Sequence, residues 1–202
     1  MRPGRSGFVV LLAGLCIALA GCGQPPSDRR AVQPGGPGLT KQDVEYQNSV
    51  DAWADGYCSA VGSLVDGLAT MPTVDPSTPR RAVQTSSDLL GSMIGALDKA
   101  GHGLQALPPA PVPAGDSVRG GMLSDFGGIR DRAAAAKQRL DAARDNPSID
   151  KDTLGAASGP LSEVSKLDVL SGFDSVPALA QAGGRAPVCQ QLTARASTAP
   201  TR

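Results

Sequence analysis

The sequence has few aromatic residues, a single histidine and no surplus of charge. Aromatic residues make up 3% of the 202 residues. A core must therefore be built from aliphatic and small side chains, which suits close helix packing better than an open β-sandwich. The 19 basic and 19 acidic residues balance, and a chain without a basic surplus gives no electrostatic indication of nucleic-acid binding.

The candidates for metal or catalytic chemistry are correspondingly sparse. His102 has no cysteine or carboxylate cluster at ligand spacing around it. The acidic stretch 145–152 lacks the alternating ligands and the glycine of a helix-loop-helix calcium loop. We therefore expect no metal site, no catalytic residue and no bound cofactor. Our hypothesis is that the protein is not an enzyme.

The first 22 residues have a distinctive order of charge and hydropathy. Arg2 and Arg5 precede an apolar run, residues 8–20, that is too short to cross a bilayer. The run ends in Leu19-Ala20-Gly21-Cys22. This arrangement resembles the signal peptide and lipobox of bacterial lipoprotein precursors. The abundance of Ala, Gly, Pro, Arg and Asp is similar to that of actinobacterial proteins.

The resemblance implies a cellular location and a membrane anchor. Residues 1–21 would be removed as a signal peptide, with Leu19, Ala20 and Gly21 read by the processing enzymes. Cys22 would become the N-terminus and carry a diacylglycerol, placing the protein on the extracytoplasmic face of the cell membrane. Two acyl chains keep a protein stably attached to the membrane, whereas a single acyl chain does not. The alternatives are a secreted protein cleaved near Ala20 and a retained N-terminal membrane anchor.

Two further cysteines remain in the mature chain, Cys58 and Cys189. In an oxidising compartment an isolated pair without a Cys-x-x-Cys motif indicates a structural disulfide. Such a bond would clamp the C-terminal segment to the first helix. We divide the mature chain into a Pro/Gly-rich tether (22–39), a helical domain (40–194) and a disordered tail (195–202).

The first predicted helix begins after Thr40, with Asp43 completing a capping box, and ends at Met71-Pro72. One apolar stripe runs along it: Tyr46, Val50, Trp53, Tyr57, Leu64 and Leu68. Asp51 and Asp55 share another face, which we expect to be solvated. Tyr46, Trp53 and Tyr57 are either the largest core anchors or an aromatic face for a ligand or partner.

Three more helices follow in the same pattern. The second is capped by Ser77 or Thr78 and is expected to end at residues 101–103, where glycines close it. A proline-rich crossover, 104–115, leads to a third helix capped by Asp116 or Ser117 and ending near residue 143. The fourth begins after Ser148 or Asp150 and is interrupted at Gly159-Pro160. A shorter helical piece follows Phe173.

These elements predict an all-α fold, an antiparallel four-helix-type bundle with a short C-terminal helical segment tied by a disulfide. Beyond residue 22 the resemblance extends only to helical lipoproteins of unassigned activity. Two functions fit. The first is a structural or interaction protein that binds another envelope protein through a helix face. The second is a module that carries an apolar or amphipathic ligand between its helices. The first is preferred, because Ala- and Gly-rich helices leave little room.

Overall fold

The domain is built from helices. The structure is a computed structural model that describes residue 38, residues 40–146 and residues 149–198, and no strand occurs among them. In chain order the helices are α1 (Lys41–Ala69), α2 (Pro79–Gln105), α3 (Gly115–Ala143), α4 (Lys151–Gly155), α5 (Ser158–Ser165), α6 (Ser171–Asp174), α7 (Pro177–Arg185) and α8 (Pro187–Thr198). The prediction of an all-α fold is confirmed.

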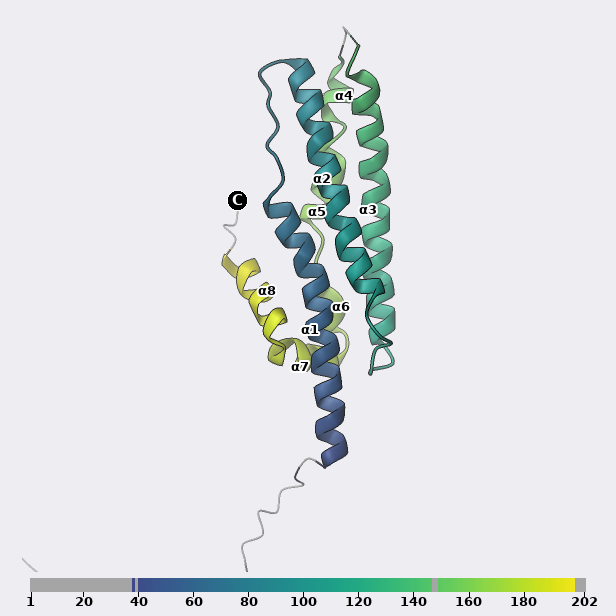
Figure 1. Cartoon of the computed structure of the whole chain (residues 1–202), viewed down its shortest axis with the longest axis vertical. Coiled ribbons are helices and arrows are strands. Elements are labelled where there is room, and N and C mark those ends of the chain that lie inside the picture. The colour runs from purple at the N-terminus through teal and green to yellow at the C-terminus, as the bar shows by residue number, and fades with distance from the viewer. Residues whose placement is uncertain (1–37, 39, 147–148, 199–202) are drawn as a thin grey trace, which may run out of the picture. The chain divides into compact units, whose positions relative to one another are not determined.

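Three long antiparallel helices, α1, α2 and α3, form the body of the bundle (Figure 1). Helix α2 packs against both α1 and α3. The fourth position is filled by short pieces, since α4 and α5 pack against α3, while α7 and α8 pack against α1. The bundle is therefore of the predicted four-helix type, with its fourth helix broken into segments.

Helix α1 begins where the sequence predicted. The Thr40 hydroxyl accepts a hydrogen bond from the Asp43 backbone N–H at 3.2 Å, and the Asp43 carboxylate accepts one from the Thr40 N–H at 2.9 Å. The stripe is buried as expected from Val50 to Leu64, and Leu68 is partly buried. The prediction was wrong at Tyr46, which is 48% exposed. The first turns of α1 are mostly exposed, and burial of its apolar stripe begins only at Val50.

Two helix boundaries differ from prediction. Helix α2 continues through Gly101-His102-Gly103 to Gln105. A Cβ on Gly103 would lie 2.9 Å from the Ala60 Cβ, so this glycine allows close packing of α2 on α1 instead of ending the helix. Helix α3 begins at Gly115, without a side-chain cap. The Asp116 carboxylate instead accepts the Ala110 N–H at 3.2 Å and closes the loop.

The predicted interruption of the fourth helix occurs earlier than expected. Asp150 caps α4 as predicted, accepting the Thr153 N–H at 2.7 Å. The helix stops at Gly155, and α5 starts at Ser158. Pro160 is then the third residue of α5, where an N–H would have no intrahelical partner. Pro160 is therefore accommodated within the first turn of α5 and does not break that helix.

The Cys58–Cys189 disulfide is confirmed. The S–S distance is 2.02 Å, the two Cα atoms are 5.0 Å apart and the residues are separated by 131 positions. The bond ties α8 to the middle of α1, and both cysteines are buried. Helix α8 continues to Thr198, so the start of the predicted disordered tail is helical.

Asp51 and Asp55 reinforce this attachment, which corrects the expectation of a solvated face. The Asp51 carboxylate accepts two hydrogen bonds from the Arg185 guanidinium, at 2.7 and 3.0 Å. The Asp55 carboxylate accepts the Val188 N–H at 2.8 Å, in the first turn of α8. The pair thus fixes α7 and α8 on α1.

Residues Leu39–Arg202 form one compact unit. All of the described core residues lie between Val50 and Leu192, and a unit with its own core can fold alone. The proposed signal peptide, the lipobox at Leu19-Ala20-Gly21 with Cys22, and nearly all of the tether lie outside the described residues. Among the described helices, none combines the length and hydropathy needed to span a bilayer.

Candidate functional site

The aromatic residues singled out in the sequence do not form one surface. Trp53 and Tyr57 are buried and stack with ring centroids 5.6 Å apart. Phe173 of α6 joins them, 4.9 Å from Tyr57 and 6.5 Å from Trp53. Such contacts add to the stability that burial provides. Tyr46 lies apart, exposed, beside a hollow of about 180 Å³ that also borders Arg185.

The polar atoms of this aromatic cluster are occupied. The Trp53 Nε1–H donates to the Pro108 carbonyl at 3.1 Å, and the Tyr57 hydroxyl donates to the Val169 carbonyl at 3.3 Å. Burial, with a smaller effect of the negative charges of Asp125 and Asp168, raises the pKa of Tyr57 well above its ordinary value. The cluster is therefore a packed junction between α1, the crossover and α6. It provides no open ligand face at Trp53.

An apolar hollow lies further along α1. We call it the apolar groove. It has a volume of about 320 Å³. It is lined by Leu64, Val65 and Leu68 of α1, Val164 of α5, the following segment Leu167–Leu170, and Leu192 and Arg195 of α8. Apolar pockets of about 300 Å³ and more are the usual sites of small ligands.

The groove has a buried floor and half-buried walls. Leu64, Val164 and Leu192 are at most 8% exposed and form the floor. Leu68 and Leu167 are partly buried and pack against the core from either side. The wall of α8 is held in place by the disulfide one turn before Leu192. The groove thus depends on three segments that are far apart in the sequence.

The charged residues at the rim have partners. The Arg195 guanidinium donates to the Asp66 carboxylate at 2.7 Å. The Asp168 carboxylate accepts the Leu170 N–H at 3.1 Å. In the described part of the chain, no buried side-chain nitrogen or oxygen lacks a hydrogen-bond partner. Both charged residues of the rim are therefore hydrogen-bonded within the chain.

The lone histidine borders a second hollow, of about 220 Å³, between α2 and α3. His102 lies there near the ion pair of Arg130 and Asp98, in which Arg130 Nε is 2.8 Å from the carboxylate. Within residues 40–146 and 149–198, no three His, Cys, Asp or Glu residues are grouped to hold a metal ion. This hollow provides a salt bridge with one imidazole, which is too little to assign a reaction.

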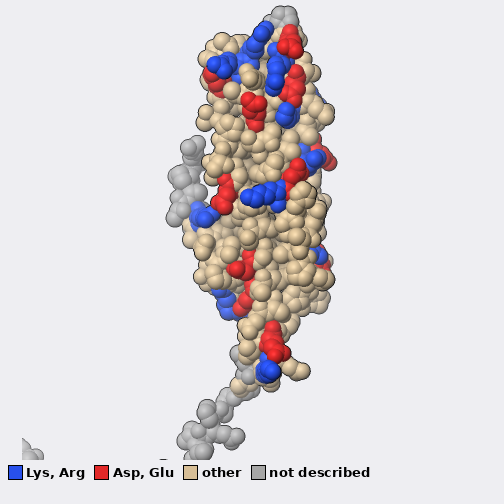
Figure 2. Space-filling view, viewed as in Figure 1, with Lys and Arg blue, Asp and Glu red and all other residues tan. Residues whose placement is uncertain are grey.

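Charged side chains of both signs are interspersed on the face shown in Figure 2, and neither sign dominates a large area. Elsewhere in the described chain, charged residues form local pairs such as Lys137 with Asp141, at 2.7 Å. This face therefore provides no basic patch of the kind that tracks a nucleic-acid backbone.

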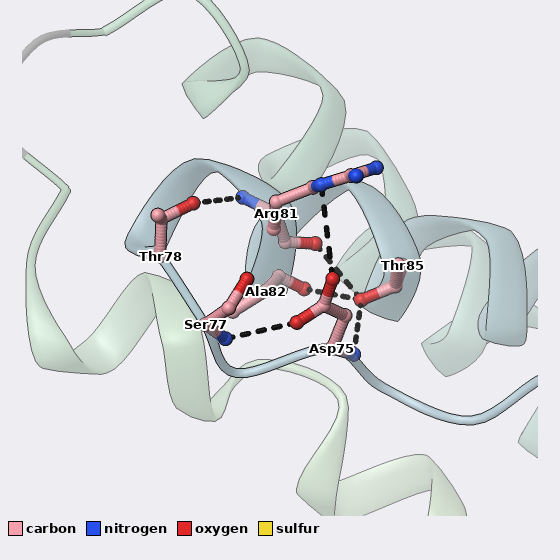
Figure 3. A network of polar contacts seen from close by, with 6 residues as sticks. All are labelled: Asp75, Ser77, Thr78, Arg81, Ala82 and Thr85. Atoms are coloured by element: carbon pink, nitrogen blue, oxygen red, sulfur yellow. Dashed lines mark hydrogen bonds and ion pairs between the residues drawn. The ribbon is translucent and has the colours of Figure 1, made fainter.

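At the start of α2, a network of polar contacts joins residues that are close together in the sequence (Figure 3). Thr78 caps the helix, accepting the Arg81 N–H at 3.2 Å, as the sequence predicted. Asp75 accepts the Ser77 N–H at 2.9 Å, and its own N–H donates to the Thr85 hydroxyl at 2.9 Å. These bonds fold the connection between α1 and α2 and leave no group directed at a ligand.

Comparisons with known proteins give no further assignment. No protein-family model matches the chain, and neither a curated protein nor a solved structure matches it. What the structure itself defines is a disulfide-tied helical bundle with an apolar groove.

Sequence reasoning missed the groove, although its residues were visible. Leu64, Leu68 and Leu167 appear in the sequence as ordinary apolar helix positions. Their meeting with Leu192 depends on the path of the chain after α5 and on the angle of α8. The one available signal was Cys189, which places the following turn, and therefore Leu192, beside α1.

Proposed function

We propose that this chain is a lipoprotein anchored through Cys22 to the extracytoplasmic face of the cell membrane, where its helical domain binds an apolar or amphipathic ligand without catalysing a reaction. The lipobox sequence supports the anchor. The buried disulfide supports an oxidising compartment. The actinobacterial composition and the Pro/Gly-rich tether fit a domain held near the membrane.

The apolar groove is the observation that carries the binding proposal. It brings eight aliphatic side chains to one open hollow of about 320 Å³, in a domain where close packing was expected to leave little room. It lies on the aromatic-bearing helix, about two turns beyond Tyr57. For this reason ligand binding now takes precedence over the alternative of a protein partner.

Binding of an envelope protein remains the second candidate. Its support is the exposure of apolar side chains near the start of α1, where Val44 is 41% and Tyr46 48% exposed. Their placement near the tether would present them close to other membrane proteins. Scattered exposed apolar residues are common on protein surfaces, so this observation is weaker than a continuous groove.

The anchor is tested in the full chain. Cells of a bacterial host that processes lipoproteins are fed an alkynyl fatty acid, and the protein is examined for label and for signal-peptide removal. We expect label in the wild type and in Cys16→Ala, whose cysteine lies within the removed segment. We expect unprocessed, unlabelled precursor for Cys22→Ala. Normal labelling of Cys22→Ala would refute the anchor.

The groove is tested with a dye that fluoresces in apolar surroundings. Leu68→Gln places a polar amide in the groove wall. Leu154→Gln makes the same change at a 36% exposed position outside the groove. We expect Leu68→Gln to reduce dye binding and Leu154→Gln to leave it unchanged. Equal dye binding by wild type and both variants would refute the groove as a binding site.

A further inference from the structure

We propose that the apolar groove accommodates a single unbranched aliphatic chain of about ten carbon atoms, belonging to an amphipathic molecule whose polar head stays in water. This inference rests on the proposed function and names the class of ligand for the same site. It is carried by the volume of the groove, the nature of its lining and the charges at its rim.

The volume sets the length of the chain. The groove measures about 320 Å³. An apolar cavity of about 150 Å³ binds one benzene molecule, which has six carbon atoms. A groove of about twice that volume therefore holds about ten to twelve carbon atoms. This is enough for one chain of medium length and too little for two chains side by side.

The lining selects an aliphatic ligand. Its apolar residues are Leu and Val without an aromatic ring. It therefore provides no flat face on which a ring could stack. The Val169 carbonyl within the lining already accepts the Tyr57 hydroxyl. A methylene chain needs no hydrogen-bond partner and therefore suits a lining in which eight of the ten side chains are aliphatic.

The rim places the polar head outside. Asp168 is exposed, and Arg195 is exposed and paired with Asp66. Apolar surface ends at this border, because Ser165 and Lys166 on the α5 side are also exposed. A stable protein interface takes about 20–30 residues from each partner, whereas ten residues line the groove. A small amphipathic molecule with a solvated head fits the border as it stands.

The experiment uses the domain of residues 38–202, labelled with ¹³C on Leu and Val methyl groups and titrated with straight-chain alcohols of six, eight, ten and twelve carbons. Methyl resonances of the groove residues report binding directly. Full burial of a methylene strengthens binding about fourfold. Because the groove is open on one side, we expect about twofold per methylene up to ten carbons and a gain below twofold from ten to twelve.

A bicyclic alcohol of the same carbon number, decahydro-2-naphthol, serves as the matched ring probe. We expect decan-1-ol to bind at least about fivefold more tightly. Leu68→Gln should lower the affinity for decan-1-ol about tenfold, and Leu154→Gln should leave it unchanged. Methyl groups of the core residue Val50, about 21 Å before Leu64 along α1, should not shift.

Three outcomes would overturn the inference: affinity that does not rise from six to ten carbons, affinity that keeps rising equally beyond ten, or equal binding of the ring probe. Each of them leaves the dye assay unaffected. Loss of the aliphatic-chain inference is therefore distinguishable from loss of the proposed function. If no alcohol shifts any groove resonance and the dye also fails to bind, both are refuted.

Discussion

Removal of the Cys58–Cys189 disulfide should cause a large loss of stability. The bond joins residues 131 positions apart. The chain-entropy model assigns to a loop of this size about 5 kcal/mol of stabilisation, by restricting the unfolded chain. Both cysteines are buried, so Cys58→Ala/Cys189→Ala also loses some packing. The free energy of unfolding of a domain of this size is about 5–15 kcal/mol. The double variant would therefore lose a large part of its free energy of unfolding.

Urea denaturation followed by circular dichroism measures the effect. With a slope of about 2 kcal/mol per M for a small domain, the midpoint should fall by about 2.5 M in the double variant. Reduction of the wild type should cause a similar fall, because it frees the same loop without changing a residue. A midpoint within about 0.5 M of the oxidised wild type would refute the role of the disulfide as the main clamp of α8.

Three further predictions concern packing and ionisation. Gly67→Ala should destabilise the domain by about 1–3 kcal/mol, because its Cβ would lie 2.6 Å from a Cβ of α2; Gly95→Ala, which meets open space, should stabilise it by about 0.5–1 kcal/mol, and equal denaturation midpoints would contradict this. A hydrogen bond from Lys137 lowers the pKa of Asp141. Its stabilisation is thus present above about pH 4 and lost at lower pH, and Asp141→Asn should flatten the acid side of the stability profile. Burial raises the pKa of Tyr57 from its ordinary 10.0. Wild type should therefore lose stability above pH 10, and a Tyr57→Phe variant with the same alkaline loss would contradict this.

The parts of the fold that depend on local chemistry could be predicted. The caps at Thr40, Thr78 and Asp150 each use a side chain to satisfy a backbone N–H three residues away, and such caps are visible in a sequence. The disulfide could be predicted as well, because Cys58 and Cys189 are the two cysteines outside the first 22 residues.

The parts of the fold that depend on tertiary contacts could not be predicted from the sequence. Gly103 resembles a helix stop, yet it lies in the helix because Ala60 of α1 approaches it closely. Tyr46 continues the apolar stripe of α1, yet it is exposed because burial of that stripe begins only at Val50. The same limitation applies to Asp51, whose partner Arg185 is 134 residues away.

The candidate site was predictable only in its parts. Periodicity placed Leu64 and Leu68 on the inner face of α1. Whether the segments after them close over that face or leave it open depends on the break between α5 and α6 and on the angle of α8. No local pattern encodes that angle, so the sequence favoured a closed bundle and the structure contains an open groove.

The most direct measurement is native mass spectrometry of the domain, secreted by a bacterial host and purified without detergent. We expect a reproducible added mass that is lost on denaturation, present in the wild type and in Leu154→Gln and absent from Leu68→Gln. A wild-type domain that carries no added mass, and that gains none when decan-1-ol is supplied, would contradict the proposal that the apolar groove binds a ligand.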